Sequence, residues 1–170
     1  MGKNELLYKF FKPLDLFASK LKEGTMLNIG DKAPDFSVQT HIGKTVSLKD
    51  FAGKTIVLWF YPKADTPGCT AEGCAFRDRN AKFHAKNAVL LGVSFDTVDE
   101  NRKFATKFGF EFPLLCDTKR QLGVAYGACK SPTDKNASRI AYVIDGKGVV
   151  TQAYPKVDAA NFPETILGTL

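Results

Sequence analysis

The sequence predicts an α/β fold, in which a mixed central sheet is flanked by helices. Residues 55–61 (TIVLWFY) and 89–95 are continuous, largely apolar runs, which are typical of strands buried on both faces. Residues 69–87 between them read as a helix, so the two strands are expected to be parallel and joined by a right-handed crossover. The turn sequence DGKG at 145–148 predicts a β-hairpin, which adds antiparallel strands to the sheet.

The other elements follow from local patterns along the chain. Residues 36–40 and 45–48 are predicted to be short strands of an N-terminal β-hairpin, with HIGK (41–44) as its turn. A helix is expected over 98–108, and Gly109 ends it. The remaining elements are expected in the order strand 112–116, one or two helical turns at 119–126, strands 140–144 and 149–154, and a closing helix at 159–167.

Length and composition limit the possible classes of protein. The chain has 170 residues, of which 44% are hydrophobic and 25% charged, so it can form one ordinary domain with a substantial core. No stretch approaches the ~20 apolar residues of a membrane-spanning helix. The net charge is +6, but basic residues are interspersed with acids, which argues against binding of nucleic acid. Four cysteines are too few for a disulfide scaffold, and no secretory signal is evident, so we expect a cytoplasmic protein.

Residues 1–26 differ from the rest and are expected to be an amphipathic helical extension of a domain at 27–170. Apolar residues recur at near-helical spacing from Leu6 to Leu21. Pro13 predicts either two short helices or a kink, and Gly24 predicts the end of the second helix. Such a segment can bind a membrane or a partner, or it can pack on its own domain or a second copy. Acidic residues lie among the basic ones and make a membrane-binding face less favourable. We therefore expect the segment to pack on protein and to make no membrane contact.

The sequence FYPKADTPGCTAEGCAFRDR at 60–79 has features that together predict a reactive cysteine. Cys69 lies where the helix starts, and the free N–H groups and positive dipole end of a helix favour a thiolate there. Pro62, Pro67 and Gly68 make the loop rigid and let the backbone approach a small substrate closely. Thr66 brings a hydroxyl that can donate and accept a hydrogen bond.

The spacing of Cys69 and Cys74 has a conformational consequence. Five helical residues separate two positions by about 7.5 Å along the axis and about 140° around it. The two Cα atoms are then too far apart for the ~4.4–6.8 Å of a disulfide. We therefore hypothesise that residues from about 67 to 76 are helical when the cysteines are reduced and locally unfolded when they form a disulfide.

Other interpretations of the cysteines are possible from the residues alone. Cys69 and Cys74 can be small buried hydrophobic residues, or zinc ligands, although the positions of Cys116 and Cys129 do not give zinc-finger spacing. Cys116 ends an apolar run and is expected to be buried. Cys129 lies in a polar loop, which suggests an exposed thiol that can act as a second resolving cysteine. The two histidines have no carboxylate at a telling spacing and are expected at the surface.

At these residues the chain resembles the peroxiredoxins. Pro62, Thr66 and Cys69 form the family's signature P-x3-T-x2-C, and Cys74 is similar to the second cysteine of the atypical two-cysteine branch called bacterioferritin comigratory protein or peroxiredoxin Q. The resemblance covers about residues 27–170. It is carried in order by IGDKAPDF (29–36), LKDFAGKTIVLWFYPKADTPGCTAEGCAFRD (48–78), LLGVSFD (90–96), FPLLCD (112–117) and SRIAYVIDGKG (138–148).

The resemblance implies a thioredoxin-like fold and an enzyme that reduces hydrogen peroxide and organic hydroperoxides without a metal or organic cofactor. It implies Cys69 as the peroxidatic cysteine, which becomes a sulfenic acid, and Cys74 as the resolving cysteine that forms a disulfide with it. Thr66 would position the peroxide, Pro62 would shield the thiolate from water, and Arg139 would be the active-site arginine. A thioredoxin-type dithiol would reduce the disulfide, and we expect a monomer or weak homodimer.

Two other functions are compatible with the same cysteines. A general thiol–disulfide oxidoreductase on this fold would favour Cys-x-x-Cys, which the sequence lacks. A non-enzymatic module would use the thiolate of Cys69 only as a redox sensor. Peroxide consumption coupled to thioredoxin separates these functions. Fast turnover indicates a peroxidase, disulfide reduction without peroxide indicates a general oxidoreductase, and one oxidation without a cycle indicates a sensor.

Overall fold

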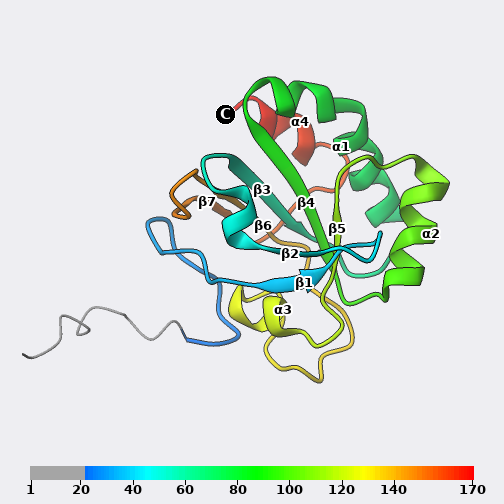
Figure 1. The fold of residues 1–170 in the computed structure, drawn as a ribbon, viewed down its shortest axis with the longest axis horizontal. Coiled ribbons are helices and arrows are strands. Elements are labelled where there is room, and N and C mark those ends of the chain that lie inside the picture. Colours follow the sequence, from blue (N-terminus) through cyan, green and yellow to red (C-terminus); the bar gives the residue numbers. More distant parts are fainter. Residues whose placement is uncertain (1–21) are drawn as a thin grey trace, which may run out of the picture.

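The computed structural model of the chain describes residues 22–170, and its centre is a five-stranded mixed sheet (Figure 1). The strand order is β5-β4-β3-β6-β7. β3, β4 and β5 are parallel, whereas β6 and β7 are antiparallel to their neighbours, so the predicted mixed sheet is confirmed. The strands are β3 (Thr55–Phe60), β4 (Ala88–Ser94), β5 (Leu114–Cys116), β6 (Ala141–Ile144) and β7 (Val150–Tyr154).

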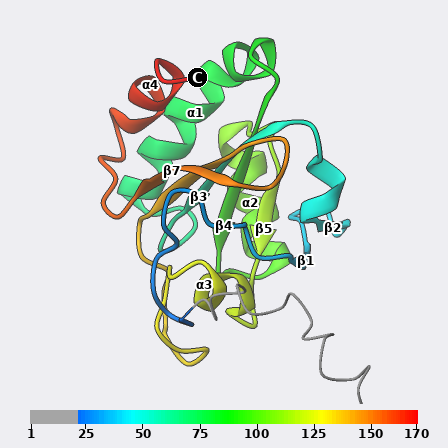
Figure 2. The same cartoon turned by 90° about the vertical axis from the view of Figure 1, so that its left-hand side faces the viewer.

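Helices cover one face of the sheet, and a hairpin and a short helix cover the other. α1 (Pro67–Ala85), α2 (Val98–Phe108) and α4 (Phe162–Leu167) contribute to the same buried apolar cluster. The opposite face carries α3 (Gln121–Ala125) and the predicted N-terminal hairpin, formed by β1 (Ser37–Gln39) and β2 (Thr45–Ser47). Figure 2 shows α1 and α4 on one side of the sheet and the hairpin on the other.

Strand β3 shows why the central strands are apolar along their whole length. Val57 and Trp59 belong to the cluster under α1, α2 and α4, whereas Ile56, Leu58 and Phe60 belong to the cluster under α3 and the hairpin. All of these side chains are buried. A strand covered on both faces has no solvent side that would favour polar residues. The continuous run in the sequence therefore predicted a central strand correctly.

The predicted helices exist, and α2 has the predicted ends, Val98–Phe108 with Gly109 after it, whereas the ends of the other helices differ. The helix expected over 69–87 is α1, which begins at Pro67 because Thr66 takes extended N-cap geometry and a proline in the first turn has no N–H that needs an acceptor. Cys69 is therefore the third residue of α1. The turns expected at 119–126 form α3, and the helix expected at 159–167 begins only at Phe162.

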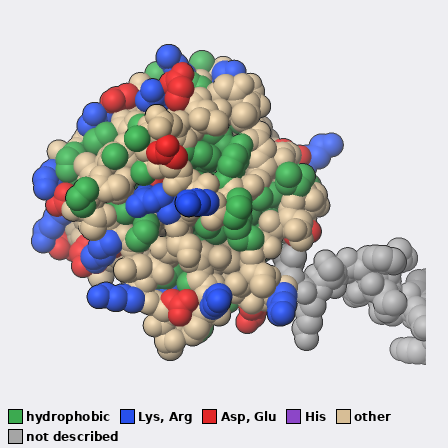
Figure 3. Space-filling model, turned by 180° about the vertical axis from the view of Figure 1, so that it is seen from behind, with side chains coloured by type: hydrophobic (Ala, Val, Ile, Leu, Met, Phe, Trp, Pro, Cys, Tyr) green, Lys and Arg blue, Asp and Glu red, His purple; other side chains and the backbone are tan. Residues whose placement is uncertain are grey.

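The helical extension expected at 1–26 lies outside the described residues up to residue 21. The described part includes a turn in which the Gly24 N–H donates to the carbonyl oxygen of Val124 in α3 (2.9 Å). Across residues 22–170, no helix is long and apolar enough to cross a membrane. On the face shown in Figure 3, Lys and Arg side chains lie among Asp and Glu side chains, as the interspersed charges of the sequence predict.

Candidate active site

Cys69 lies at the end of the sheet where β3 leads into α1. β3 ends at Phe60, residues 61–66 form the connecting loop, and Cys69 is in the first turn of the helix. The thiol is fully buried and belongs to the same cluster as Trp59 and Tyr61. The first backbone N–H groups of an α-helix have no partner within the helix, and they favour an anion near them. Cys69 therefore lies at the start of a helix, where the sequence predicted it.

A buried carboxylate holds the loop before α1. Asp96, which follows β4, accepts a hydrogen bond from the Ala64 N–H (2.8 Å) and forms an ion pair with Lys63. Asp65 takes a left-handed backbone conformation (φ 58°), and its carboxylate pairs with Lys107 of α2 (2.9 Å). These contacts tie the loop to β4 and α2, and they fix the position from which α1 starts.

The guanidinium of Arg139 joins Cys69 to a second buried group. Its Nη2 donates to Cys69 Sγ (3.3 Å), and its Nη1 donates to Glu72 Oε2 (2.6 Å). Arg139 reaches the thiol because β6, which begins two residues later, pairs with β3. Gly68 permits this approach, since a Cβ at that position would lie 3.1 Å from Nη2. The structure therefore brings together two of the predicted site residues that are 70 positions apart.

Glu72 is a site residue that sequence reasoning missed. It lies three residues after Cys69, so both side chains are on the same face of α1, and it is fully buried. Burial raises the pKa of the Glu72 carboxyl to about 7, although the hydrogen bond from Arg139 acts in the opposite direction. Among the described residues, Oε2 has Arg139 as its partner and Oε1 has none. An acid one turn after a cysteine would have been the signal, but it is informative only once both are known to face inward.

A buried polar chain lies at the carboxyl ends of the parallel strands. The Tyr61 hydroxyl donates to Asn101 Oδ1 (2.6 Å), and the Asn101 amide donates to Ser94 Oγ (3.1 Å) and Cys116 Sγ (3.4 Å). Burial raises the pKa of Tyr61 well above its ordinary value, so its hydroxyl stays neutral. The sequence did not predict this chain, because its members come from four separate segments and meet only in the fold.

Thr66 and Pro62 lie in the loop before α1, and both are partly exposed. The Thr66 hydroxyl donates to the carbonyl oxygen of Lys63 (2.8 Å), which leaves its oxygen free to accept. In the described part of the chain, no hydrogen bond joins Thr66 to Cys69. The roles of Thr66 and Pro62 at the thiol therefore stay predictions.

Cys74 lies on α1 five residues after Cys69 and is partly exposed. The helix is continuous from Pro67 to Ala85, and all four cysteines within residues 22–170 are free. Helical geometry keeps the two positions apart, as their spacing predicts. A bond between the two sulfurs therefore requires α1 to change.

The remaining thiols and His41 differ in part from expectation. Cys116 is buried as expected. Cys129 is not exposed, because its N–H donates to the Gly123 carbonyl oxygen (3.2 Å) and its sulfur packs against α3. It is 6% exposed, and burial raises the pKa of its thiol to about 11, which argues against a second resolving thiol. His41, expected at the surface, is half-buried, and its Nδ1 accepts from the Leu114 N–H (3.1 Å).

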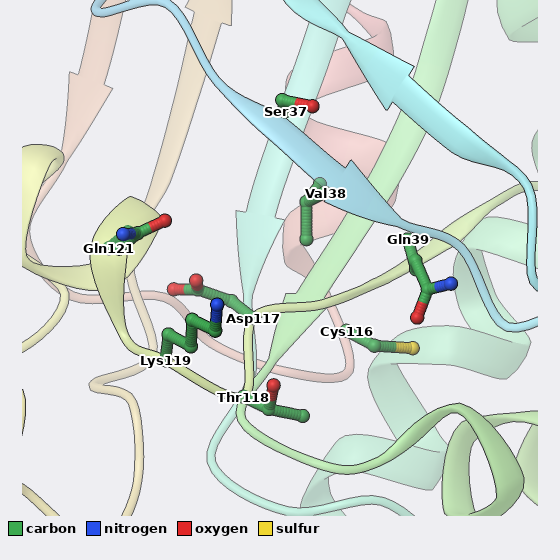
Figure 4. A pocket seen from close by; sticks show the side chains of 8 residues that line it. All are labelled: Ser37, Val38, Gln39, Cys116, Asp117, Thr118, Lys119 and Gln121. Carbon is green, nitrogen blue, oxygen red and sulfur yellow. The ribbon is translucent and has the colours of Figure 1, made fainter.

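A polar pocket of about 280 Å³ lies apart from the thiol, between β1 and the segment that follows β5 (Figure 4). Ser37 and Gln39 line one side, and Thr118 and Lys119 line the other. Cys69 is not among its lining residues. Within the described residues, no group of three or more His, Cys, Asp and Glu side chains is arranged to hold a metal ion.

Comparisons with known proteins agree with this geometry. Residues 29–153 match the AhpC/TSA family. Peroxiredoxin Bcp of Bacillus subtilis is 38% identical over 149 residues, which are 85% of this chain and 95% of that protein. Chloroplastic peroxiredoxin Q of Triticum aestivum is 39% identical over 125 residues, which are 74% of this chain and 58% of that protein.

Solved structures show the same relationship. A cysteine-to-serine mutant of PrxQ from Xylella fastidiosa superimposes with a TM-score of 0.80 at 30% identity, over 85% of this chain and 96% of that chain. Peroxidoxin BcpB from Mycobacterium tuberculosis gives a TM-score of 0.78 at 31% identity, over 84% and 96%. The predicted thioredoxin-like fold is thereby confirmed. The chain belongs to the AhpC/TSA family and is a peroxiredoxin of the Bcp and peroxiredoxin Q type, a thiol-dependent peroxidase that acts on hydroperoxides.

Proposed function

We propose that Cys69 reacts with the hydroperoxide, that Cys74 resolves the product to an intramolecular disulfide, and that a thioredoxin-type dithiol restores both thiols. The observation that carries this proposal is the Arg139 guanidinium at 3.3 Å from the buried Cys69 Sγ, in the first turn of a helix. A fixed cation and a helix N-terminus both favour the thiolate, which is the nucleophilic form. Cys69 therefore has the surroundings that attack on a peroxide needs.

Attack by the Cys69 sulfur on the O–O bond forms an S–O bond and expels the distal oxygen as water, or as an alcohol from an organic hydroperoxide. The leaving oxygen develops negative charge before it takes up a proton. Arg139 and the free N–H groups of the first turn are fixed donors for that charge. The Thr66 hydroxyl, whose proton points to Lys63, accepts from the O–H of the peroxide, and Pro62 shields the thiolate from water.

Cys74 then attacks the sulfenic sulfur of Cys69. An S–S bond forms, the S–O bond breaks, and the oxygen leaves as water after taking up a proton. Because both cysteines lie on one continuous helix, this step requires local unfolding of about residues 67–76. Exchange with a thioredoxin-type dithiol reduces the disulfide and lets the helix form again, and the cycle uses no metal or organic cofactor.

The proposal also includes a cellular setting and a division of the chain. Residues 27–170 form the catalytic domain, and residues 1–26 form a helical extension that packs on its own domain or on a second copy. We place the protein in the cytoplasm, as a monomer or weak homodimer without nucleic-acid or membrane contact. The wheat relative is described as chloroplastic, so location differs among the relatives.

Peroxide consumption with thioredoxin, thioredoxin reductase and NADPH tests the catalytic assignments. We expect Cys69→Ser to abolish turnover, and Cys74→Ser to permit a single stoichiometric oxidation without cycling. Cys129→Ser is the matched control, since a buried thiol outside the site should leave turnover unchanged.

The possible results separate the functions. Retained turnover in Cys69→Ser would refute its role as nucleophile, and repeated turnover in Cys74→Ser would show that another thiol resolves. Reduction of protein disulfides without any need for peroxide would indicate a general oxidoreductase. One oxidation of the wild-type protein with no return to the thiols would indicate a redox sensor.

A further inference from the structure

We infer that Phe110 is a latch that controls local unfolding of the helix around Cys69 and Cys74. The inference rests on the proposed function, because it concerns the step between the sulfenic acid and the disulfide. Phe110 is a positioning residue in this scheme, since it acts on the helix that carries the two thiols and not on the peroxide.

The ring of Phe110 lies directly on the backbone of α1 between the two cysteines. Gly73 immediately precedes Cys74, and a Cβ at Gly73 would lie 2.5 Å from Cζ of the ring and within 3.3 Å of two further ring carbons. Only a residue without a side chain permits so close an approach. The ring therefore packs on the helix itself, at the segment that must leave its helical position for the sulfurs to meet.

Phe110 is held firmly on the side of α2. Its ring is edge-to-face with Phe104 (4.9 Å between centroids) and stacked on Phe112 (5.1 Å). Its backbone N–H donates to the carbonyl oxygen of Ala105 in α2 (2.9 Å). Aromatic pairs of this geometry stabilise each other beyond the burial of their area. Phe110 is thus the fixed partner in the contact, and α1 is the part that moves away.

A polar contact one turn further along α1 marks where the unfolding stops. Nη1 of Arg77 donates to the carbonyl oxygen of Phe108 (2.7 Å). Arg77 lies four residues after Gly73 on the same face of the helix, but beyond the segment 67–76 that must unfold. This contact can persist while the segment unfolds. The contact of Phe110 with Gly73, like those of Arg139 with Cys69 and Glu72, lies within the segment and has to break when it unfolds.

The latch decides between two fates of the sulfenic acid. If Cys74 attacks first, an S–S bond forms and water leaves. If a second hydrogen peroxide reacts first, the Cys69 sulfur gains a second oxygen and becomes a sulfinic acid, while that peroxide is reduced to water. Only the unfolded segment lets Cys74 reach Cys69. Weakening the latch should therefore raise the ratio of disulfide to sulfinic acid.

The experiment measures this ratio by peptide mass after exposure of the reduced full chain to a graded excess of hydrogen peroxide. Phe110→Leu keeps an apolar side chain but removes the ring carbons that contact Gly73. We expect it to raise the ratio about tenfold, which corresponds to about 1.4 kcal/mol. Phe110→Met, a milder change of shape, should raise it in the same direction if leucine impairs folding, and peptide mass distinguishes oxidation of that methionine from oxidation of Cys69.

Phe95→Leu is the matched control. Phe95 is buried to the same degree, and it also packs on a helical glycine, Gly123 of α3, where a Cβ would lie 2.6 Å from its Cζ. It belongs to the cluster on the other face of the sheet. We expect this variant to lose thermal stability much as Phe110→Leu does, but to keep the wild-type ratio of products.

Each result has a distinct meaning. An unchanged ratio in the folded Phe110 variants, or an equal rise in Phe95→Leu, overturns the latch and leaves the proposed function standing. If the wild-type chain forms no Cys69–Cys74 disulfide under any dose of peroxide, the proposed function fails, and the latch fails with it.

Discussion

At the scale of single residues, the geometry around Cys69 depends on the shape of arginine. Arg139 donates through two different nitrogens, one to the thiol sulfur and one to the Glu72 carboxylate. A planar guanidinium presents these donors in a fixed fork, whereas lysine carries one ammonium on a flexible stem. Both contacts therefore depend on the guanidinium, and a positive charge alone should not replace it.

Arg139→Lys should slow the reaction of Cys69 with hydrogen peroxide by about 10²-fold, the order of magnitude lost with one fixed donor in a charge-stabilising site. Single-turnover stopped-flow measurements with the reduced protein give the second-order rate constant. Arg79→Lys is the control. Arg79 lies on α1, the helix that carries Cys69, but its side chain pairs with the exposed Glu164. A rate constant for Arg139→Lys equal to that of the control would contradict the need for the fork.

At the scale of elements, the loop 61–66 places the first turn of α1 relative to the sheet, and Asp96 is a buried carboxylate that binds two of its residues. This carboxylate is 2% exposed and binds both the Ala64 N–H and Lys63. Glu100 also pairs with Lys63 (3.2 Å), but that pair is exposed to solvent. Hydrogen bonds to a buried charge contribute more to stability than exposed ion pairs do. Asp96 should therefore hold the loop.

Asp96→Ala should lower the free energy of unfolding by about 1–3 kcal/mol and slow the peroxide reaction, because the Ala64 N–H loses its acceptor and the start of α1 becomes less fixed. Urea unfolding and stopped-flow kinetics measure the two effects. Glu100→Gln removes the exposed pair but keeps the hydrogen bond that this side chain accepts from the Thr97 N–H at the start of α2. Glu100→Gln should lower the free energy of unfolding by less than about 1 kcal/mol. A loss equal to that of Asp96→Ala would show that pairing with Lys63, and not the hydrogen bond from the Ala64 N–H, holds the loop.

At the scale of the whole molecule, the sequence predicted the features that depend on contiguous residues. The run 55–61 has apolar residues on both alternating sides of the strand, which indicates a central strand. The residues of the motif P-x3-T-x2-C all lie between 62 and 69. Groups that come from distant segments were not predictable from the residues alone, and Arg139 was expected only from the family resemblance. The role of Glu72 can be recognised only once Arg139 is known to contact it. The contact of Phe110 with Gly73 likewise depends on how α2 lies beside α1.

Cys129 shows that the composition of a segment does not determine whether one residue in it is exposed. The polar residues 130–135 after it predicted an exposed thiol. The backbone decides otherwise, since the Cys129 N–H and the neighbouring Ala128 N–H both donate to the carbonyl oxygen of Gly123 and turn this part of the loop onto α3. Polarity of a segment describes its average environment, whereas one side chain follows the hydrogen bonds of its own backbone.

The buried carboxyl of Glu72 relates the active site to the stability of the whole molecule. Burial raises its pKa in the folded protein to about 7, from an ordinary value of 4.5. Between these values the folded state keeps a proton that the unfolded state has released. The stability that this proton contributes is therefore fully present below about pH 4.5 and is lost as the pH rises through 7. At ~1.4 kcal/mol per pKa unit, the loss is about 3 kcal/mol.

Glu72→Gln should remove this loss and keep an oxygen that accepts from Arg139. The free energy of unfolding is measured with urea from pH 5 to pH 8 in reductant, and the wild-type value is subtracted from that of the variant, so that groups titrating alike in both cancel. We expect the difference to rise by about 2–3 kcal/mol across this range and to level off above the folded-state pKa. A difference that stays flat would mean that Glu72 titrates alike in both states. A difference that falls with pH would mean that the ion pair with Arg139 outweighs the cost of burial, because the ionised carboxylate would then stabilise the fold.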